Sequence, residues 1–180
     1  RLAPEKGLST LLDAWRTIDA RLPLKIVGDG PMAGDVKSAV ADITGVEWLG
    51  RRSRDEVLDL MRGAYLLVFP STWYEGFPVT LAEAFACGLP VVTSDLGSMR
   101  SVVDDGAIGR RFPAGDANAL AEVVLWAVDN PRRIDEMGLA ARREYEERYS
   151  PETNYRQLLE IYQRAVGRVA GSAAGLAAVR

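Results

Sequence analysis

The sequence contains no histidine and only one cysteine, Cys87, among its 180 residues. Without histidine the chain has no imidazole for a Ser-His-Asp triad or for a metal site. A single cysteine cannot form a disulfide within the chain. Any proton transfer in this domain must therefore use carboxylates, the substrate or another domain.

The sequence also lacks an excess of positive charge and a long apolar segment. Its net charge of −3 at pH 7 gives no electrostatic reason to bind nucleic acid or an anionic membrane. No apolar run approaches the roughly 20 residues that cross a bilayer as a helix. The apolar share of 48% and the charged share of 26% are ordinary for a globular domain, and the chain is long enough for a full hydrophobic core.

Short β-branched runs alternate with longer segments that have the apolar period of a helix. The expected strands are 24–27, 46–49, 66–69, 91–93 and about 108–112; the expected helices are 6–21, the segment from the turn at 28–31 to about 42, 53–63, 79–87, 116–128, 130–149 and 150–166. This alternation predicts an α/β fold, a Rossmann-like doubly wound parallel sheet with helices on both faces. We expect residues 1–166 to form this domain, and the Ala- and Gly-rich residues 167–180 to form a tail.

Two carboxylates, Glu75 and Glu83, bracket a loop that leads from a strand into a helix. A strand, a Gly-containing loop and a helix start present free backbone N–H groups and a positive dipole end to a phosphate. A carboxylate further along that helix is placed to reach sugar hydroxyls beside the phosphate. The alternative is a capping box, Thr80-x-x-Glu83, in which Glu83 serves only its own helix and Glu75 is a solvated loop acid. The segment alone leaves both interpretations open.

Five motifs in order resemble the retaining glycosyltransferases of the GT-B fold, family 4 (glycosyl transferases group 1). They are Arg1 with Glu5-Lys6-Gly7, Val27-Gly28-Asp29-Gly30-Pro31, Trp48-Leu49-Gly50, Glu75-Gly76-Phe77 with Glu83, and Ala86-x-Gly88-x-Pro90-Val91-Val92. The resemblance covers residues 1 to about 165. It implies that this chain is the C-terminal, donor-binding half of a two-domain enzyme, with the acceptor-binding N-terminal domain outside this sequence. It also implies a central strand that ends at Arg1, so either the sequence is a fragment or this strand comes from elsewhere.

The resemblance assigns catalytic roles to Arg1, Lys6 and Glu75. Arg1 and Lys6 would hold the diphosphate of a nucleotide-sugar donor, which suits a leaving group that gains negative charge as the glycosidic bond breaks. Glu75 would face hydroxyls of the transferred sugar, and Glu83 would accept hydrogen bonds from the ribose. For Arg1 and Lys6 the alternative is a solvated helix start, although cations there oppose the helix dipole. Neither a metal ion nor a cofactor is implied.

The remaining donor contacts come from loops. Backbone amides of Gly76, Phe77, Val79 and Thr80 would surround the distal phosphate and the sugar, small residues at Gly28 and Gly30 would let the nucleotide approach, and backbone groups near Arg52 would read the base.

The sequence departs from the family pattern at two of these places. Pro78 stands where relatives often have glycine and removes one N–H donor, and Arg54 stands where many relatives have an acid. Trp73 and Tyr74 are either part of a sugar pocket or loop packing.

The resemblance thus predicts transfer of a sugar from a UDP-, GDP- or ADP-sugar to an unknown acceptor, with retention at the anomeric carbon. The enzyme is expected in the cytoplasm, or held at the inner membrane face by its other half, and this half alone is expected to be inactive. One alternative is a nucleotide-sugar 2-epimerase, against which the absence of histidine argues. Another is a non-catalytic nucleotide-binding domain, against which the set of Glu75, Glu83, Arg1 and Lys6 argues.

Overall fold

The structure is a computed structural model that describes residues 1–18 and 22–177, with the side chains of residues 1–18 and 22–166. The chain divides into two compact units, Arg1–Arg142 and Arg143–Arg180. Within the described residues, all five strands and every predicted site residue lie in the first unit. The second unit consists of a π-helical turn, Tyr145–Tyr149, followed by the long helix α8, Pro151–Ala177.

The strands of the first unit form two parallel sheets. One pairs β1 (Leu24–Val27) with β2 (Val46–Gly50), and the other has the order β3 (Leu67–Phe69), β4 (Val91–Ser94), β5 (Gly109–Phe112). Within the described residues β1 and β3 do not pair with one another. The predicted α/β fold with parallel strands is confirmed, and the predicted central strand from outside the sequence stays a prediction.

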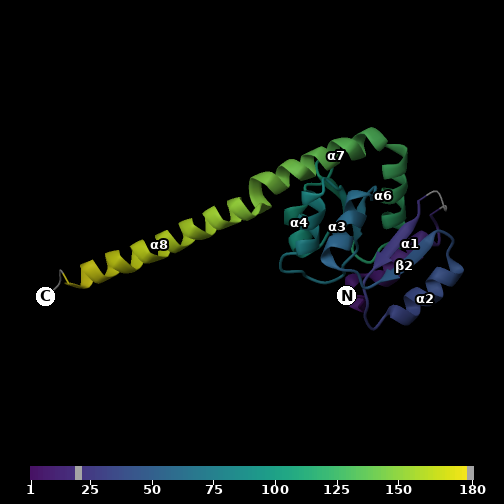
Figure 1. Cartoon of the computed structure of the whole chain (residues 1–180), viewed down its shortest axis with the longest axis horizontal. Helices are drawn as coiled ribbons and strands as arrows, with labels where there is room; N and C mark the ends of the chain where they lie inside the picture. The colour runs from purple at the N-terminus through teal and green to yellow at the C-terminus, as the bar shows by residue number, and fades with distance from the viewer. Residues whose placement is uncertain (19–21, 178–180) are drawn as a thin grey trace. The chain divides into compact units, whose positions relative to one another are not determined.

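Helices of the first unit separate the strands as the sequence pattern predicts (Figure 1). They are η1 (Pro4–Lys6), α1 (Leu8–Trp15), α2 (Ala33–Asp42), α3 (Arg54–Arg62), α4 (Val79–Ala86), α5 (Gly97–Val102), α6 (Ala117–Asp129) and α7 (Pro131–Glu144, which continues into the second unit). Helix α5 was not predicted, because its six residues are too few to show an apolar period. The first helix ends at Trp15, and residues 19–21 of the predicted 6–21 helix lie outside the described residues.

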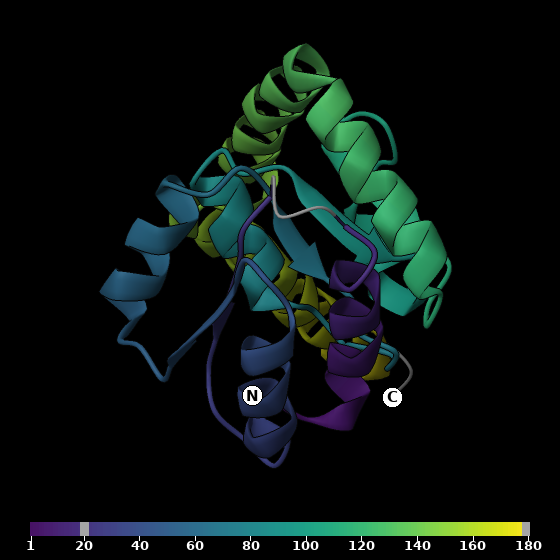
Figure 2. The same ribbon diagram turned by 90° about the vertical axis from the view of Figure 1, so that its right-hand side faces the viewer.

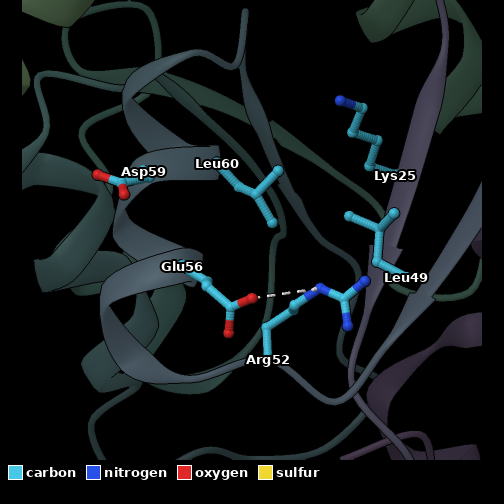
Figure 3. Close-up of a pocket in the computed structure, with 6 residues that line it drawn as sticks. All are labelled: Lys25, Leu49, Arg52, Glu56, Asp59 and Leu60. Carbon is cyan, nitrogen blue, oxygen red and sulfur yellow. Dashed lines mark ion pairs between the residues drawn. The ribbon is translucent and has the colours of Figure 1, made fainter.

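One face of the β1–β2 sheet packs into the hydrophobic core, and the other borders a hollow. Leu24 and Ile26 are buried with Val36 of α2 in the main hydrophobic core. Lys25, whose side chain faces the other way, lines a hollow together with residues of α3 (Figure 3). The same core extends to α1 and α6, which pack side by side (Figures 1 and 2). Burial therefore alternates along β1: one face of this sheet lies in the core, and the other is open toward the hollow beside α3.

Two helix starts are fixed by side-chain caps that the sequence signals. Ser53 and Glu56 form a reciprocal capping box at the start of α3. The hydrogen bonds from Ser53 hold the pKa of Glu56 below its ordinary value. At the start of α6 the Ala119 N–H donates to the Asp116 carboxylate at 2.9 Å. These caps fix where α3 and α6 begin.

Helix α8 continues beyond the predicted end of the domain at residue 166. Its backbone is helical through Ala177, and residues 178–180 of the predicted 167–180 tail lie outside the described residues. Among the helices that the structure describes, none combines the length and the apolar composition needed to cross a bilayer.

Candidate active site

The turn at Glu5–Gly7 is docked against the loop that follows β3. Gly7 adopts a left-handed backbone, and a Cβ placed on it would lie 1.8 Å from the Pro70 carbonyl oxygen. The Glu5 carbonyl accepts a hydrogen bond from the Thr72 N–H at 3.0 Å, and Ser71 Oγ lies 3.1 Å from the same carbonyl oxygen. Only glycine permits both this conformation and this approach, so the Glu-Lys-Gly motif positions the loop after β3.

Lys6 extends from this turn to the carboxylate of Glu75. Its Nζ lies 2.6 Å from Glu75 Oε1, and the Ser71 hydroxyl donates to the same oxygen at 2.8 Å. Partial burial acts to raise the pKa of Glu75, but the hydrogen bonds from Lys6 and Ser71 and the Lys6 charge outweigh it, so this pKa is lowered. Glu75 is therefore an ionised carboxylate that is fixed in position by Lys6 and Ser71. The alternative interpretation, in which Glu75 and Lys6 are solvated surface charges, does not fit this ion pair.

The backbone on either side of Glu75 is also held. The Ser71 hydroxyl accepts from the Trp73 N–H at 3.3 Å, and the Ser98 hydroxyl donates to the Glu75 carbonyl at 2.8 Å. Trp73 and Tyr74 remain largely exposed on this loop. A loop fixed at both ends by hydrogen bonds presents its side chains with little loss of conformational entropy on binding.

Helix α4 begins directly after this loop, at Val79, with Pro78 in the N-cap position. The Leu81 N–H donates to the Pro78 carbonyl at 2.9 Å, and no side-chain cap is formed at this helix start. The capping-box interpretation of Thr80 and Glu83 is therefore wrong. Proline in the N-cap position moves the first helical residue to Val79, which places Glu83 in the second turn.

The carboxylate of Glu83 instead pairs with an arginine from a neighbouring helix. Arg54, the first residue of α3, places its Nε 3.3 Å from Glu83 Oε1. The side chain of Arg54 is 77% exposed and that of Glu83 is 23% exposed. Glu83 is thus accessible from solvent in the second turn of α4, the helix that begins shortly after Glu75.

The loop residues that were predicted to contact phosphate and sugar lie at the surface between the two carboxylates. Gly76, Phe77 and Val79 are exposed and Thr80 is half-buried, whereas Pro78 is buried. The N–H groups in the first turn of a helix have no acceptor within the helix. Pro78 has no N–H, so phosphate contacts through the amide of residue 78 are excluded.

Gly28 and Gly30 lie beside the N-terminal segment. The Leu2 N–H donates to the Asp29 carbonyl at 2.9 Å, and a Cβ on Gly30 would lie 2.3 Å from the Leu2 carbonyl oxygen. The close approach of Leu2 therefore explains why residue 30 is a glycine. Arg1 is exposed beside Gly28, and within the described residues no hydrogen bond or ion pair joins it to Lys6 or Glu75.

Arg52 lines a hollow of about 430 Å³ between the β1–β2 sheet and α3 (Figure 3). Its Nε lies 3.9 Å from Glu56 Oε1. The other lining residues are Lys25, Leu49, Asp59 and Leu60. Lys25 was not among the predicted site residues, because a lysine within a strand gives no sequence signal of a ligand.

The structure brings together Lys6 and Glu75, two predicted residues from distant parts of the sequence, and pairs Glu83 with Arg54. Sequence reasoning missed the contributions of Ser71 and Ser98, since neither belongs to a motif that was recognised. Within the described residues no three Cys, Asp or Glu side chains gather in a way that could hold a metal ion.

The parallel α/β architecture is that of one Rossmann-like half of a GT-B protein, as similarity to solved structures shows. The HepE protein of Anabaena, solved with UDP and glucose, superposes with a TM-score of 0.82 and 26% identity over 91% of this chain and 46% of its own. The model of the family Glycosyl transferases group 1 matches residues 1–130. The chain belongs to this family.

Two curated relatives show how much of a family member this chain represents. The amylovoran biosynthesis glycosyltransferase AmsK of Erwinia amylovora is 31% identical over 91% of this chain and 43% of its own length. The phosphatidyl-myo-inositol mannosyltransferase of Mycobacterium leprae is 33% identical over 89% of this chain and 43% of its own. The chain therefore spans less than half the length of these relatives.

Proposed function

We propose that this chain binds a nucleoside diphosphate sugar as the donor-binding half of a glycosyltransferase that retains the anomeric configuration. The observation that carries the proposal is the Lys6–Glu75 ion pair at 2.6 Å, held beside the start of α4 in a chain of the Glycosyl transferases group 1 family. The names of the relatives, which are glycosyltransferases, support the same reaction class.

In this proposal Lys6 and Arg1 stabilise the diphosphate as it becomes the leaving group. Cations contribute most where negative charge develops, so their effect is larger in the transition state than in the bound donor. Lys6 is already placed by Glu75, and Arg1 is exposed and free to turn toward an anion. Glu75 accepts a hydrogen bond from a hydroxyl of the transferred sugar through an oxygen that Lys6 does not occupy.

The rest of the donor follows the surface from α4 toward α3. The amides at the start of α4, with the positive end of its dipole, receive the distal phosphate, and Glu83 receives the ribose hydroxyls. The base lies beyond Glu83, near the backbone of Arg52. A UDP-sugar is our first choice, because the HepE structure that resembles this chain contains UDP; GDP- and ADP-sugars use the same phosphate and ribose contacts.

The acceptor is bound by a second domain in this proposal, since the relatives are more than twice as long as the matched region. Closure of two domains around a donor expels water and brings the acceptor hydroxyl to the anomeric carbon. The 180 residues alone are therefore expected to bind the donor weakly and not to transfer the sugar. We place the reaction in the cytoplasm.

Titration calorimetry with UDP, GDP and ADP, combined with a transfer assay on simple acceptors, tests the proposal. We expect binding of at least one nucleotide with a micromolar dissociation constant, about −5 to −7 kcal/mol, and no transfer. The absence of binding by all three nucleotides would contradict the donor site. Turnover by these residues alone would contradict the need for a second domain.

A further inference from the structure

Arg54 extends from a fixed point at the start of α3. The Ser53 N–H donates to Glu56 Oε2 at 2.8 Å, and the Glu56 N–H donates to the Ser53 hydroxyl at 3.3 Å. This capping box fixes the backbone next to Arg54. A cation in the first turn is disfavoured by the helix dipole, so the position of Arg54 gains nothing from its own helix.

The partner of Arg54 lies on a different helix, because its Nε donates to Glu83 Oε1 at 3.3 Å. The guanidinium is 77% exposed, and ion pairs of such exposed groups contribute little to folding stability. Stability is therefore a poor explanation of the contact. The contact does determine where the Glu83 carboxylate points.

The ion pair occupies only one oxygen of Glu83. Among the described residues, no hydrogen bond reaches Glu83 Oε2. A different pair on the same chain shows the contrast: Arg100 holds both oxygens of Asp95, through Nε and Nη2, each at 2.9 Å. A two-point pair of that kind engages both carboxylate oxygens, whereas the one-point pair at Glu83 engages only Oε1 and leaves Oε2 as an open acceptor.

We propose that Arg54 is a positioning residue: it holds Oε1 of Glu83 so that Oε2 accepts a hydrogen bond from a ribose hydroxyl of the donor nucleotide. This inference rests on the proposed function, because it takes Glu83 as the ribose-binding group. Arg54 remains paired when the nucleotide binds, so it aids the nucleoside part of the donor and has no effect on the phosphates.

The test is titration calorimetry of the 180-residue chain with four probes: UDP, 2′-deoxy-UDP, 3′-deoxy-UDP and pyrophosphate. In the wild type, removal of the hydroxyl that Glu83 binds weakens affinity. Arg54→Gln is expected to weaken the binding of UDP about two- to fivefold, the range for an exposed ion pair. The variant should also show a smaller difference in affinity between UDP and that deoxy analogue. Pyrophosphate affinity should not change. Arg54→Lys should restore part of the loss.

Arg62→Gln is the matched control, because Arg62 is an exposed arginine of the same helix that pairs with Asp59, and it should bind all four probes as the wild type does. Unchanged or tighter UDP binding by Arg54→Gln would overturn the inference, and so would an equal loss for pyrophosphate. Failure of the wild type to bind UDP would overturn the proposed function as well. The two failures are thus distinguished by the wild-type titration.

Discussion

Gly7 lies against the carbonyl oxygen of Pro70, and this contact joins the N-terminal turn to the loop that carries Glu75. Because a Cβ at this position would lie 1.8 Å from that oxygen, any side chain at residue 7 must push the turn away from the loop. Lys6 and the Glu5 carbonyl, which contact the same loop, would move with it.

We therefore expect Gly7→Ala to destabilise the domain and to weaken nucleotide binding together. The left-handed backbone alone costs about 1–2 kcal/mol for alanine, and the overlap with Pro70 adds to this. Urea unfolding and UDP calorimetry measure the two effects. Gly34→Ala is the control, since a Cβ on Gly34 would meet no atom within 4 Å and Gly34 lies in α2, where alanine is favoured. Unaltered stability of Gly7→Ala would contradict the docking.

Lys6→Met should weaken UDP binding by about 1.5–3 kcal/mol, the range for a hydrogen bond to a charged group. Methionine keeps most of the length of the side chain and removes its charge. Calorimetry with UDP and with uridine separates the phosphate contribution, because uridine has no phosphate and should bind both proteins equally. Lys37→Met, at an exposed position on α2, should behave as the wild type. An unchanged UDP dissociation constant for Lys6→Met would remove Lys6 from the site.

Glu83→Gln should weaken the binding of UDP and leave the binding of pyrophosphate unchanged. The neutral amide is a poorer acceptor for hydroxyl groups than the carboxylate, and it loses the ion pair with Arg54. We expect a loss of about 1.5–3 kcal/mol, the range for hydrogen bonds that involve a charged group. Glu122→Gln on α6 is the control for an exposed glutamate. Equal losses for both probes would show that Glu83 acts on the fold and not on the ribose.

The contribution of Glu75 to stability should depend on pH with a defined sign. Its pKa is lowered in the folded state, so the unfolded state binds more protons in the interval between the two pKa values, and stability falls as the pH falls through it. The wild type should be more stable than Glu75→Gln at pH 7, by about 1 kcal/mol. This difference should shrink below the ordinary glutamate pKa of about 4.3. Urea unfolding of both proteins from pH 7 to pH 3 measures it; a constant difference would contradict the assignment.

The strands and most helices were predictable because the apolar pattern and its period are local properties of the sequence. The spacing of Ser53 and Glu56 predicts the start of α3, and the structure contains that capping box. The same spacing at Thr80 and Glu83 gave the wrong alternative, because Pro78 takes the cap position and shifts the register of α4. Four letters of sequence cannot distinguish the two cases.

The pairing of side chains could not be predicted from the sequence. Lys6 and Glu75 are 69 positions apart, and the docking of the Glu5–Gly7 turn on the loop after β3 brings them together. The pair between Arg54 and Glu83 joins two helices whose contact no local pattern encodes. A departure from the family pattern at Arg54 was visible in the sequence, but its partner was not.

The central place of β4 has a consequence for the dynamics of the domain. All four of its residues are buried, and it is hydrogen-bonded to β3 on one side and β5 on the other, whereas β1 and β2 pair only with each other in the described part of the chain. Backbone amide hydrogens exchange with solvent when the structure opens locally, and such opening is rarest where a strand is paired on both sides. Deuterium should therefore enter the backbone amides of β1 and β2 well before those of β4.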